Sequence, residues 1–259
     1  MPLAYTLDQF ELLTLVVFRV TGLFLAAPLF GSRDVPKTVK LGLGLLTALL
    51  VFPAVSIPAA ALPRELGGFV LFAAAELAIG VTAGFAATML FSVFQLAGQH
   101  VAQQMGIAMA DVIDPFSETE VSVLGQFQYF LALAVYVGIG AHRWLLAAVA
   151  ESFASIPVGA FRPTPALVGL LSDSFGGIFA LSFQVAAPVL VALMLSTVAL
   201  GFVARAVPQM NVLLLSFPIQ IGLGIGVMIW TLPSFVCVVA DLCGGLTGDV
   251  GRLMAAAAG

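Results

Sequence analysis

Carboxylates are the residues best able to do chemistry in this sequence, and their densest group lies in the polar segment 95–122. The segment carries Asp111, Asp114, Glu118 and Glu120 and has no lysine or arginine. The i, i+3 spacing of Asp111 and Asp114 would suit two carboxylates acting together as acid and base. Pro115 follows Asp114 directly, however, and Asp-Pro favours a turn, so a rigid catalytic pair is not expected.

Glu76 is a second candidate, because it lies well inside an apolar segment. A carboxylate in such a place is costly to bury and is a functional hypothesis by default. It could relay protons. Alternatively, either protonated or paired with another group, it could hold two helices together. The sequence shows no obvious intramembrane basic partner for it, which favours the structural role.

The sequence lacks the motifs of the other common kinds of reactive site. The chain has two histidines, with no H-x-x-x-H or H-E-x-x-H spacing, and it has no G-x-S-x-G elbow. Cys237 and Cys243 are interpreted as small buried hydrophobic residues. The GLGIG run at 222–226 lacks the strand–turn–helix context of a nucleotide loop. We therefore expect no enzyme activity, no cofactor and no metal.

Composition indicates a membrane protein that contacts lipid. The 259 residues are 61% hydrophobic and 8% charged, with a mean hydropathy of +1.16, whereas soluble domains carry about 25% charged residues. The net charge of −4 includes no basic stripe, so nucleic-acid binding is excluded. The first residues have no basic region or cleavage pattern, so no cleaved signal peptide is expected.

Six apolar segments of roughly membrane-crossing length predict an all-α membrane protein of about six long, partly broken helices arranged as hairpins. The segments are 12–30, 41–62, 69–97, 123–141, 175–204 and 212–240. Prolines such as Pro188, Pro218 and Pro233 lie inside them and tend to kink or end a helix. We expect one integrated unit over residues 1–259.

The basic residues do not orient these segments. With six plain crossings, one side carries four lysines and arginines and the other side also carries four, so the positive-inside signal is absent. This balance suggests that some hairpins pack inside an assembly and do not cross lipid.

Two pairs of glycines predict close helix packing. Gly80 and Gly84 form one G-x-x-x-G pattern, and Gly222 and Gly226 form another. Small residues at this spacing let helix backbones approach closely in a membrane.

The part of the polar segment from Gly106 to Phe116 is the candidate working loop. It is long and partly apolar, contains the adaptable Met109 and ends at the Asp114-Pro115 turn. Ser117 and Glu120 match a capping box, which predicts that the fourth helix starts at Ser117. The loop either lines or closes a pathway or is an ordinary connection outside the membrane. We favour the first reading.

Two stretches resemble the FliR/SctT family of type III export gate proteins. The first is Met105-Gly106 followed by Asp114-Pro115, preceded by AGQHVAQQ and followed by an apolar helix that ends in GAHRWLLAAVAESFASIPVG. The second is the run RAVPQMN from Arg205 to Asn211, followed by SFPIQIGLGIGV. The order of segments agrees along essentially the whole chain.

The resemblance implies a structural pore subunit in the bacterial inner membrane, at the flagellar basal body. It implies a single copy beside several copies of FliP and FliQ in a closed, helically arranged gate, with FlhB and FlhA as neighbours. Unfolded flagellar subunits would be transient substrates. It also implies a FliP-like part at about 1–160 and a FliQ-like part at about 170–259, joined near 155–174.

The resemblance further implies roles for individual residues. Residues 106–122 would act as a plug that begins at Gly106 and turns at Asp114 and Pro115, and its apolar closing groups would be Met109, Val112, Ile113 and Phe116. Some family members have aromatic residues where Met109 and Val112 stand, so the closing surface here is expected to be softer. A packing junction between the fifth and sixth helices would comprise Arg205, Pro208, Gln209, Met210, Asn211 and Pro218.

Two alternatives remain open at the level of sequence. One is a gate subunit of an injectisome. The other is a proton-coupled transporter that uses Glu76 and broken helices to form a site at mid-membrane. The effect of Glu76→Gln on transport, compared with its effect on assembly, would discriminate the transporter from the gate.

Overall fold

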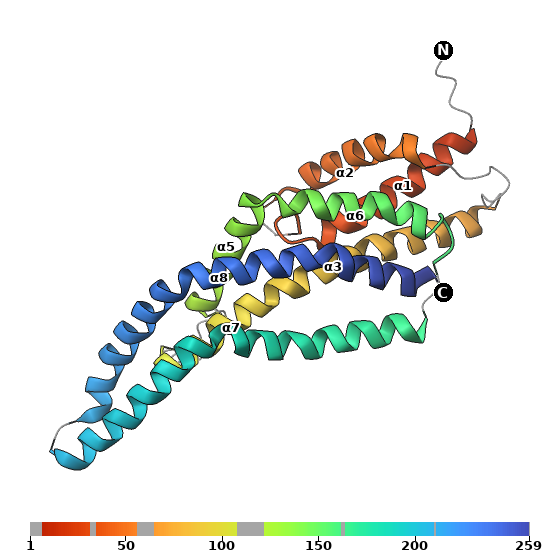
Figure 1. Ribbon diagram of the computed structural model, residues 1–259. Coiled ribbons are helices and arrows are strands. Elements are labelled where there is room, and N and C mark those ends of the chain that lie inside the picture. The colour runs from red at the N-terminus through yellow and green to blue at the C-terminus, as the bar shows by residue number, and fades with distance from the viewer. Residues whose placement is uncertain are drawn as a thin grey trace. The chain divides into compact units, whose positions relative to one another are not determined.

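The computed structural model describes residues 7–31, 35–55, 65–107, 122–161, 164–209 and 211–258. Helices make up nearly all of these residues, and no strand occurs among them (Figure 1). The elements, with the labels of Figure 1, are α1 (Leu7–Ala26), α2 (Lys37–Val51), the 3-10 turn η1 (Phe52–Ala54), α3 (Leu66–Met105), α5 (Val123–Gly138), α6 (Ala141–Ser155), α7 (Pro165–Ala206) and α8 (Val212–Ala258).

Four of the described helices, α1, α3, α7 and α8, are long and apolar enough to cross a membrane, and α5 with α6 would make a fifth broken span. The predicted all-α membrane fold is confirmed. The apolar segments 41–62 and 123–141 give shorter helices than expected, since α2 has 15 residues and α5 has 16. Each is too short to cross about 30 Å of hydrocarbon alone.

Pro188, Pro218 and Pro233 do not end the helices that contain them. Pro188 lies inside the 42-residue α7, and Pro218 and Pro233 lie inside the 47-residue α8. A proline removes one backbone donor, and in membrane helices the freed carbonyl is often satisfied by neighbours or by local adjustment.

The helix of the fourth apolar segment begins at Val123, so the prediction that it starts at Ser117 is wrong; Ser117 itself lies outside the described residues. Ser122 is the N-cap, and its hydroxyl accepts a hydrogen bond from the backbone N–H of Gly125 at 3.4 Å. This is the capping interaction that stabilises a helix start, made by a serine five positions later than the one the capping box indicated.

The helices divide into two compact units, and both units take parts of α3, α7 and α8. The first contains Met1–Met89, Gly140–Ser174 and Cys243–Gly259. In it, α2 lies alongside α1 (Figure 1), and a core cluster joins Leu12 and Leu15 of α1 with Ala73 of α3 and Val158.

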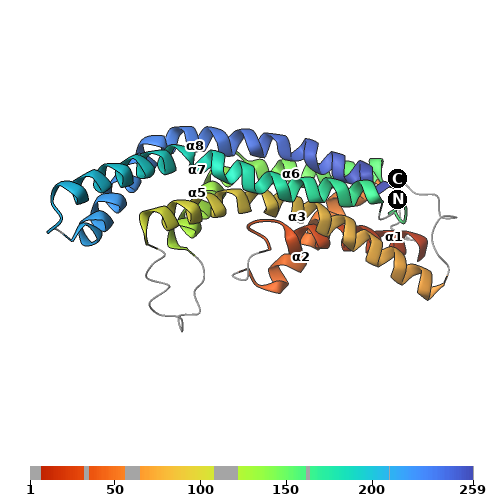
Figure 2. The same ribbon diagram turned by 90° about the horizontal axis from the view of Figure 1, so that it is seen from below.

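The second unit contains Leu90–Ile139 and Phe175–Leu242. Its core packs one face of α3 against α7, with the buried side chains Ala97, Val101, Met105, Ala186, Val189 and Leu193. Within this unit α7 and α8 run antiparallel and side by side, because a short turn after Ala206 reverses the chain (Figures 1 and 2).

Candidate functional site

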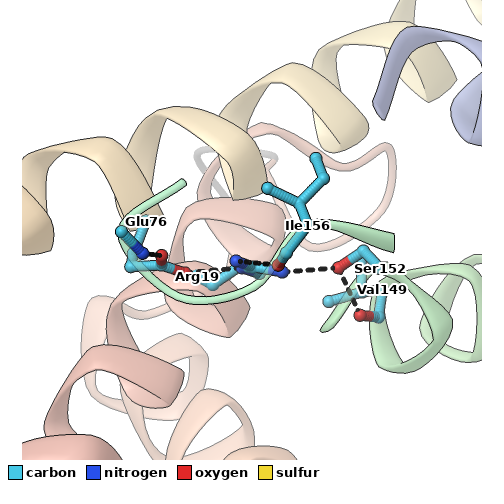
Figure 3. Close-up of polar contacts among 6 residues, drawn as sticks. Arg19, Glu76, Val149, Ser152 and Ile156 are labelled. Carbon is cyan, nitrogen blue, oxygen red and sulfur yellow. Dashed lines mark hydrogen bonds and ion pairs between the residues drawn. The ribbon is translucent and has the colours of Figure 1, made fainter. Parts of the chain in front are cut away.

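A buried ion pair joins two helices of the first unit. The Nε of Arg19, on α1, donates to Oε2 of Glu76, on α3, at 2.6 Å, and both side chains have no exposed surface. Figure 3 shows the guanidinium between Glu76 on one side and Ser152 and Ile156 on the other.

The other polar atoms of the pair are also bonded. The two terminal nitrogens of Arg19 donate to Oγ of Ser152 at 3.1 Å and to the carbonyl of Ile156 at 3.0 Å (Figure 3). The second oxygen of Glu76 accepts from the backbone N–H of Gly159 at 2.9 Å. A buried charge pair is tolerated only when such additional bonds satisfy it, so this network is a joint between α1, α3 and the α6 region.

The Phe153 ring covers the same guanidinium. The central carbon of Arg19 lies 4.0 Å from the ring centroid. Arginine stacks well on aromatic faces because its charge is delocalised and weakly hydrated. The aromatic ring therefore packs against the charged end of the buried pair.

Small residues bring α1 and α3 close enough for the ion pair. A Cβ atom added at Gly80 would overlap the carbonyl oxygen of Arg19, and one added at Gly84 would lie 2.7 Å from the carbonyl oxygen of Leu23. The backbone of α1 therefore touches α3 at both glycines, and the hydroxyl of Thr88 donates to the carbonyl of Ala26 at 2.5 Å one turn further along. Close approach at a small-residue seam is the geometry that G-x-x-x-G permits.

The expectation that Glu76 lacks a basic partner inside the membrane is wrong, because Arg19 is that partner. A signal was present in the sequence, since both residues are charges set in apolar segments. Sequence alone did not show that the two segments face each other, 57 residues apart.

The candidate loop leaves α3 at a well-defined helix stop. The N–H of Gly106 donates to the carbonyl of Gln103 at 3.1 Å, and the N–H of Ile107 donates to the carbonyl of Ala102 at 3.1 Å. These two bonds, with Gly106 at φ +78°, make a Schellman motif, which favours glycine because other residues are strained there. The backbone is thus held by hydrogen bonds up to Ile107, the second residue of the predicted loop.

Helix α8 packs on this stop within the second unit. A Cβ at Gly106 would lie 2.7 Å from the Phe217 ring. Met105 is fully buried, and its methyl group lies where a Cβ at Gly224 would be. Phe217 and Gly224 were not among the predicted site residues, although both lie in the stretch SFPIQIGLGIGV that carries the family resemblance.

The predicted plug residues after Gly106 lie outside the described residues. They are Met109, Val112, Ile113, Asp114, Pro115 and Phe116. The plug therefore stays a prediction from the sequence.

The predicted junction between the fifth and sixth segments falls at the turn between α7 and α8. Arg205 is in the last turn of α7, where a cation is favourable, and Pro208 and Gln209 follow in the turn, exposed. The Oδ1 atom of Asn211 accepts from the N–H of Leu214 at 3.4 Å at the start of α8. Pro218 lies inside α8, and Met210 lies outside the described residues.

The two glycine pairs differ in their surroundings. Atoms added as Cβ at Gly222 and Gly226 would meet nothing within 4 Å among the described residues, unlike those at Gly80 and Gly84. Close helix packing at Gly222 and Gly226 stays a prediction. In the part of the chain that the structure describes, no group of three or more His, Cys, Asp or Glu side chains could hold a metal ion.

Comparison with known proteins places these features in a family. The family model described as bacterial export proteins, family 1, matches residues 10–246. The flagellar biosynthetic protein FliR of Bacillus subtilis (strain 168) is 32% identical, over 98% of this chain and 98% of its own length. The FliR proteins of Escherichia coli (strain K12) and Aquifex aeolicus (strain VF5) are 28% and 27% identical, covering 92% and 88% of this chain and 89% and 88% of their own lengths.

Proposed function

Because the chain belongs to the bacterial export proteins, family 1, we propose that it is a structural gate subunit of the flagellar type III export apparatus. The observation that carries the proposal is the extent of the likeness. It runs through residues 10–246, which include all or part of every described helix, and relatives named for flagellar biosynthesis match almost end to end.

The subunit would let unfolded flagellar proteins cross the inner membrane at the flagellar basal body. It would do so as one member of an assembly with FliP and FliQ, beside FlhB and FlhA. Its own contribution is structural: the chain supplies apolar helices, a buried joint that fixes α1 against α3, and a loop that starts at a fixed point.

Closure of the pathway falls, in this proposal, to the loop that begins at Gly106. An apolar constriction can hold ions back by dewetting and still part for a polypeptide. The support from the described residues is the helix stop at Gly106 and Ile107, which fixes where the loop leaves α3.

Removal of the chain tests the proposal directly. In the native host, a deletion strain is expected to stop exporting flagellar subunits and to lose swimming, and the full-length chain supplied in trans restores both. Normal export of flagellar subunits by the deletion strain would refute the flagellar assignment. Loss of effector secretion with intact flagella would point to an injectisome instead.

Shortening of the segment Gly106–Phe116 tests the plug. The shortened chain is expected to enter the assembly in normal amount and to make the membrane leaky to small ions, measured as ion flux into vesicles that hold the purified assembly. Unchanged ion conductance with an intact assembly would rule out this role for the loop.

Glu76→Gln tests the transporter alternative. Both oxygens of Glu76 accept hydrogen bonds, which supports a joint between helices. If the variant assembled normally but lost all export, Glu76 would be mechanistic and the gate proposal would be incomplete.

A further inference from the structure

Helix α8 holds the end of α3 through two contacts in which a large side chain meets a glycine. The terminal methyl group of Met105, the last residue of α3, lies where a Cβ atom of Gly224 would stand. In return, the ring of Phe217 lies 2.7 Å from the place where a Cβ atom of Gly106 would stand. Each side of the contact, within the second unit, thus supplies one large apolar side chain and one stretch of bare backbone.

The two contacts lie on one face of α8. Phe217 and Gly224 are seven residues apart, which places them on the same side of a helix, about 10 Å from each other. Among the described residues between Asn211 and Val238, Gly224 is the only one that is buried. Met105 therefore meets α8 at the one position in this stretch that the rest of the described chain covers.

The residues held by α8 are also those that form the helix stop. Gly106 has φ +78°, and the N–H groups of Gly106 and Ile107 each donate back into α3 at 3.1 Å. Helix ends fray when little packs on them, and a glycine lets a neighbouring side chain pack directly on the backbone. The ring of Phe217 over Gly106 and the methyl group of Met105 at Gly224 supply that packing.

We propose that Phe217 and Gly224 are positioning residues, which hold Gly106 in its left-handed conformation and so set the direction in which the chain leaves α3. The functional consequence rests on the proposed function, in which the segment that begins at Gly106 closes the pathway. The inference goes further, because it assigns control of the start of that segment to α8 and names the two residues responsible.

Hydrogen exchange of the isolated full chain in detergent tests the positioning role. The exchange rates of the N–H groups of Gly106 and Ile107 are measured by mass spectrometry, with fragmentation to single residues. Phe217→Ala removes the ring that covers Gly106, so both rates should rise about tenfold. Phe217→Tyr keeps the ring, so both rates should stay within about threefold of those in the native chain.

Gly224→Leu supplies a second variant, because the added side chain displaces the methyl group of Met105. It should raise the same two rates about tenfold. Met105→Ala in the same chain should return them to near the native rates, since it removes the colliding group. Gly201→Leu in α7 is the matched control, where an added Cβ meets nothing within 4 Å among the described residues, and it should change neither rate.

The N–H of Ala97, a fully buried residue of α3, is the internal reference and should exchange at the native rate in every variant. A merely structural role would raise exchange at Ala97 as much as at Gly106, and that result would overturn the positioning role. Native rates at Gly106 and Ile107 in either Phe217→Ala or Gly224→Leu would overturn it too, as would an equal rise in Gly201→Leu.

Ion flux into vesicles that hold the purified assembly tests the consequence. Phe217→Ala and Gly224→Leu should raise the flux about tenfold, since an apolar closure must be well placed to exclude water, whereas Phe217→Tyr should not. If shortening of residues 106–116 leaves the flux unchanged, the proposed role of the loop fails, and the exchange rates still decide the positioning role. If that shortening raises the flux but Phe217→Ala and Gly224→Leu do not, only the inference about α8 fails.

Discussion

Arg19 and Glu76 share a site with no exposed surface, and this isolation sets how much each depends on the other. Moving two charges out of water is costly, and their mutual attraction offsets that cost only when both are present and fully hydrogen-bonded. The ion pair is therefore tolerated when both residues are present, and the loss of either residue destabilises the fold.

Loss of one partner should destabilise the chain strongly. Arg19→Met is expected to cost about 3–5 kcal/mol, because it leaves the Glu76 carboxylate buried without its cation. The measurement is the temperature at which half of the purified protein unfolds in detergent. Arg19→Met combined with Glu76→Met should cost less than the sum of the two single changes.

The chain offers a matched control in the exposed pair of Asp249 and Arg252, whose side chains are 55% and 74% exposed. Asp249→Asn should change stability by less than about 1 kcal/mol, since exposed ion pairs contribute little. Equal losses for Arg19→Met and Asp249→Asn would contradict a structural role for the buried pair.

Gly106 is the second residue whose type the structure explains. Gly106→Ala is expected to cost about 1–2 kcal/mol for the left-handed backbone, and the added methyl group would also press on the Phe217 ring. Thermal unfolding in detergent measures the loss, and Phe217→Ala in the same chain should recover the steric part. The control is Gly177→Ala in α7, where an added Cβ meets nothing within 4 Å; a comparable loss there would refute the explanation.

Among the helices, glycines allow α1 and α3 to cross in close contact, whereas α7 and α8 stay continuous over their full length in spite of their prolines. The α1–α3 crossing needs backbone contact at Gly80 and Gly84. The long α7 and α8 contain three prolines and remain helical, because a membrane helix keeps its other backbone bonds in surroundings without competing water.

Gly80→Ala should therefore separate α1 from α3. The added methyl group would overlap the Arg19 carbonyl, so the helices must move apart and the ion pair must lengthen. We expect a loss of about 1–3 kcal/mol, as for other overpacked sites, measured by thermal unfolding.

Gly67→Ala, on the same helix, is the control, because a Cβ there meets nothing within 4 Å. Alanine is the better helix former, so this change should be neutral or slightly stabilising. If Gly67→Ala and Gly80→Ala behaved alike, helix propensity and not packing would be the cause.

In the molecule as a whole, the residues that the structure describes leave much of α8 uncovered. In the apolar stretch of α8 that could span a membrane, 11% of residues are buried, against 50% in the corresponding stretch of α3. Trp230 is 81% exposed. Lipid or neighbouring helices must cover such a surface, which agrees with a subunit built to join an assembly.

The two native cysteines of α8 can show whether neighbouring helices cover it, and no mutation is needed. Cys237 is exposed and Cys243 is buried. In the isolated chain in detergent, N-ethylmaleimide should label Cys237 and spare Cys243, as mass spectrometry of the peptides would show. In the purified assembly in the same detergent, labelling of Cys237 should fall about tenfold if neighbouring helices cover it, and undiminished labelling would mean that no neighbour covers Cys237.

Features that depend on residues near each other in the chain could be predicted before the fold was known. Hydropathy gave the all-α membrane class, because burial in lipid acts through local composition. The end of α3 was not predicted, since the third apolar segment was expected to end at Ala97 and the helix continues to Met105. The start of α5 was missed, since Ser117 and Ser122 are both competent caps and local pattern does not choose between them.

Which helix faces meet became visible in the folded chain alone. It paired Arg19 with Glu76, set Gly80 and Gly84 against α1 while Gly222 and Gly226 met nothing within the described chain, and brought Phe217 and Gly224 onto the end of α3. Such contacts join residues far apart in sequence, and in a chain of this composition many helix faces are equally apolar. Which of them pack together depends on the fit of particular side chains in space, which hydropathy does not encode.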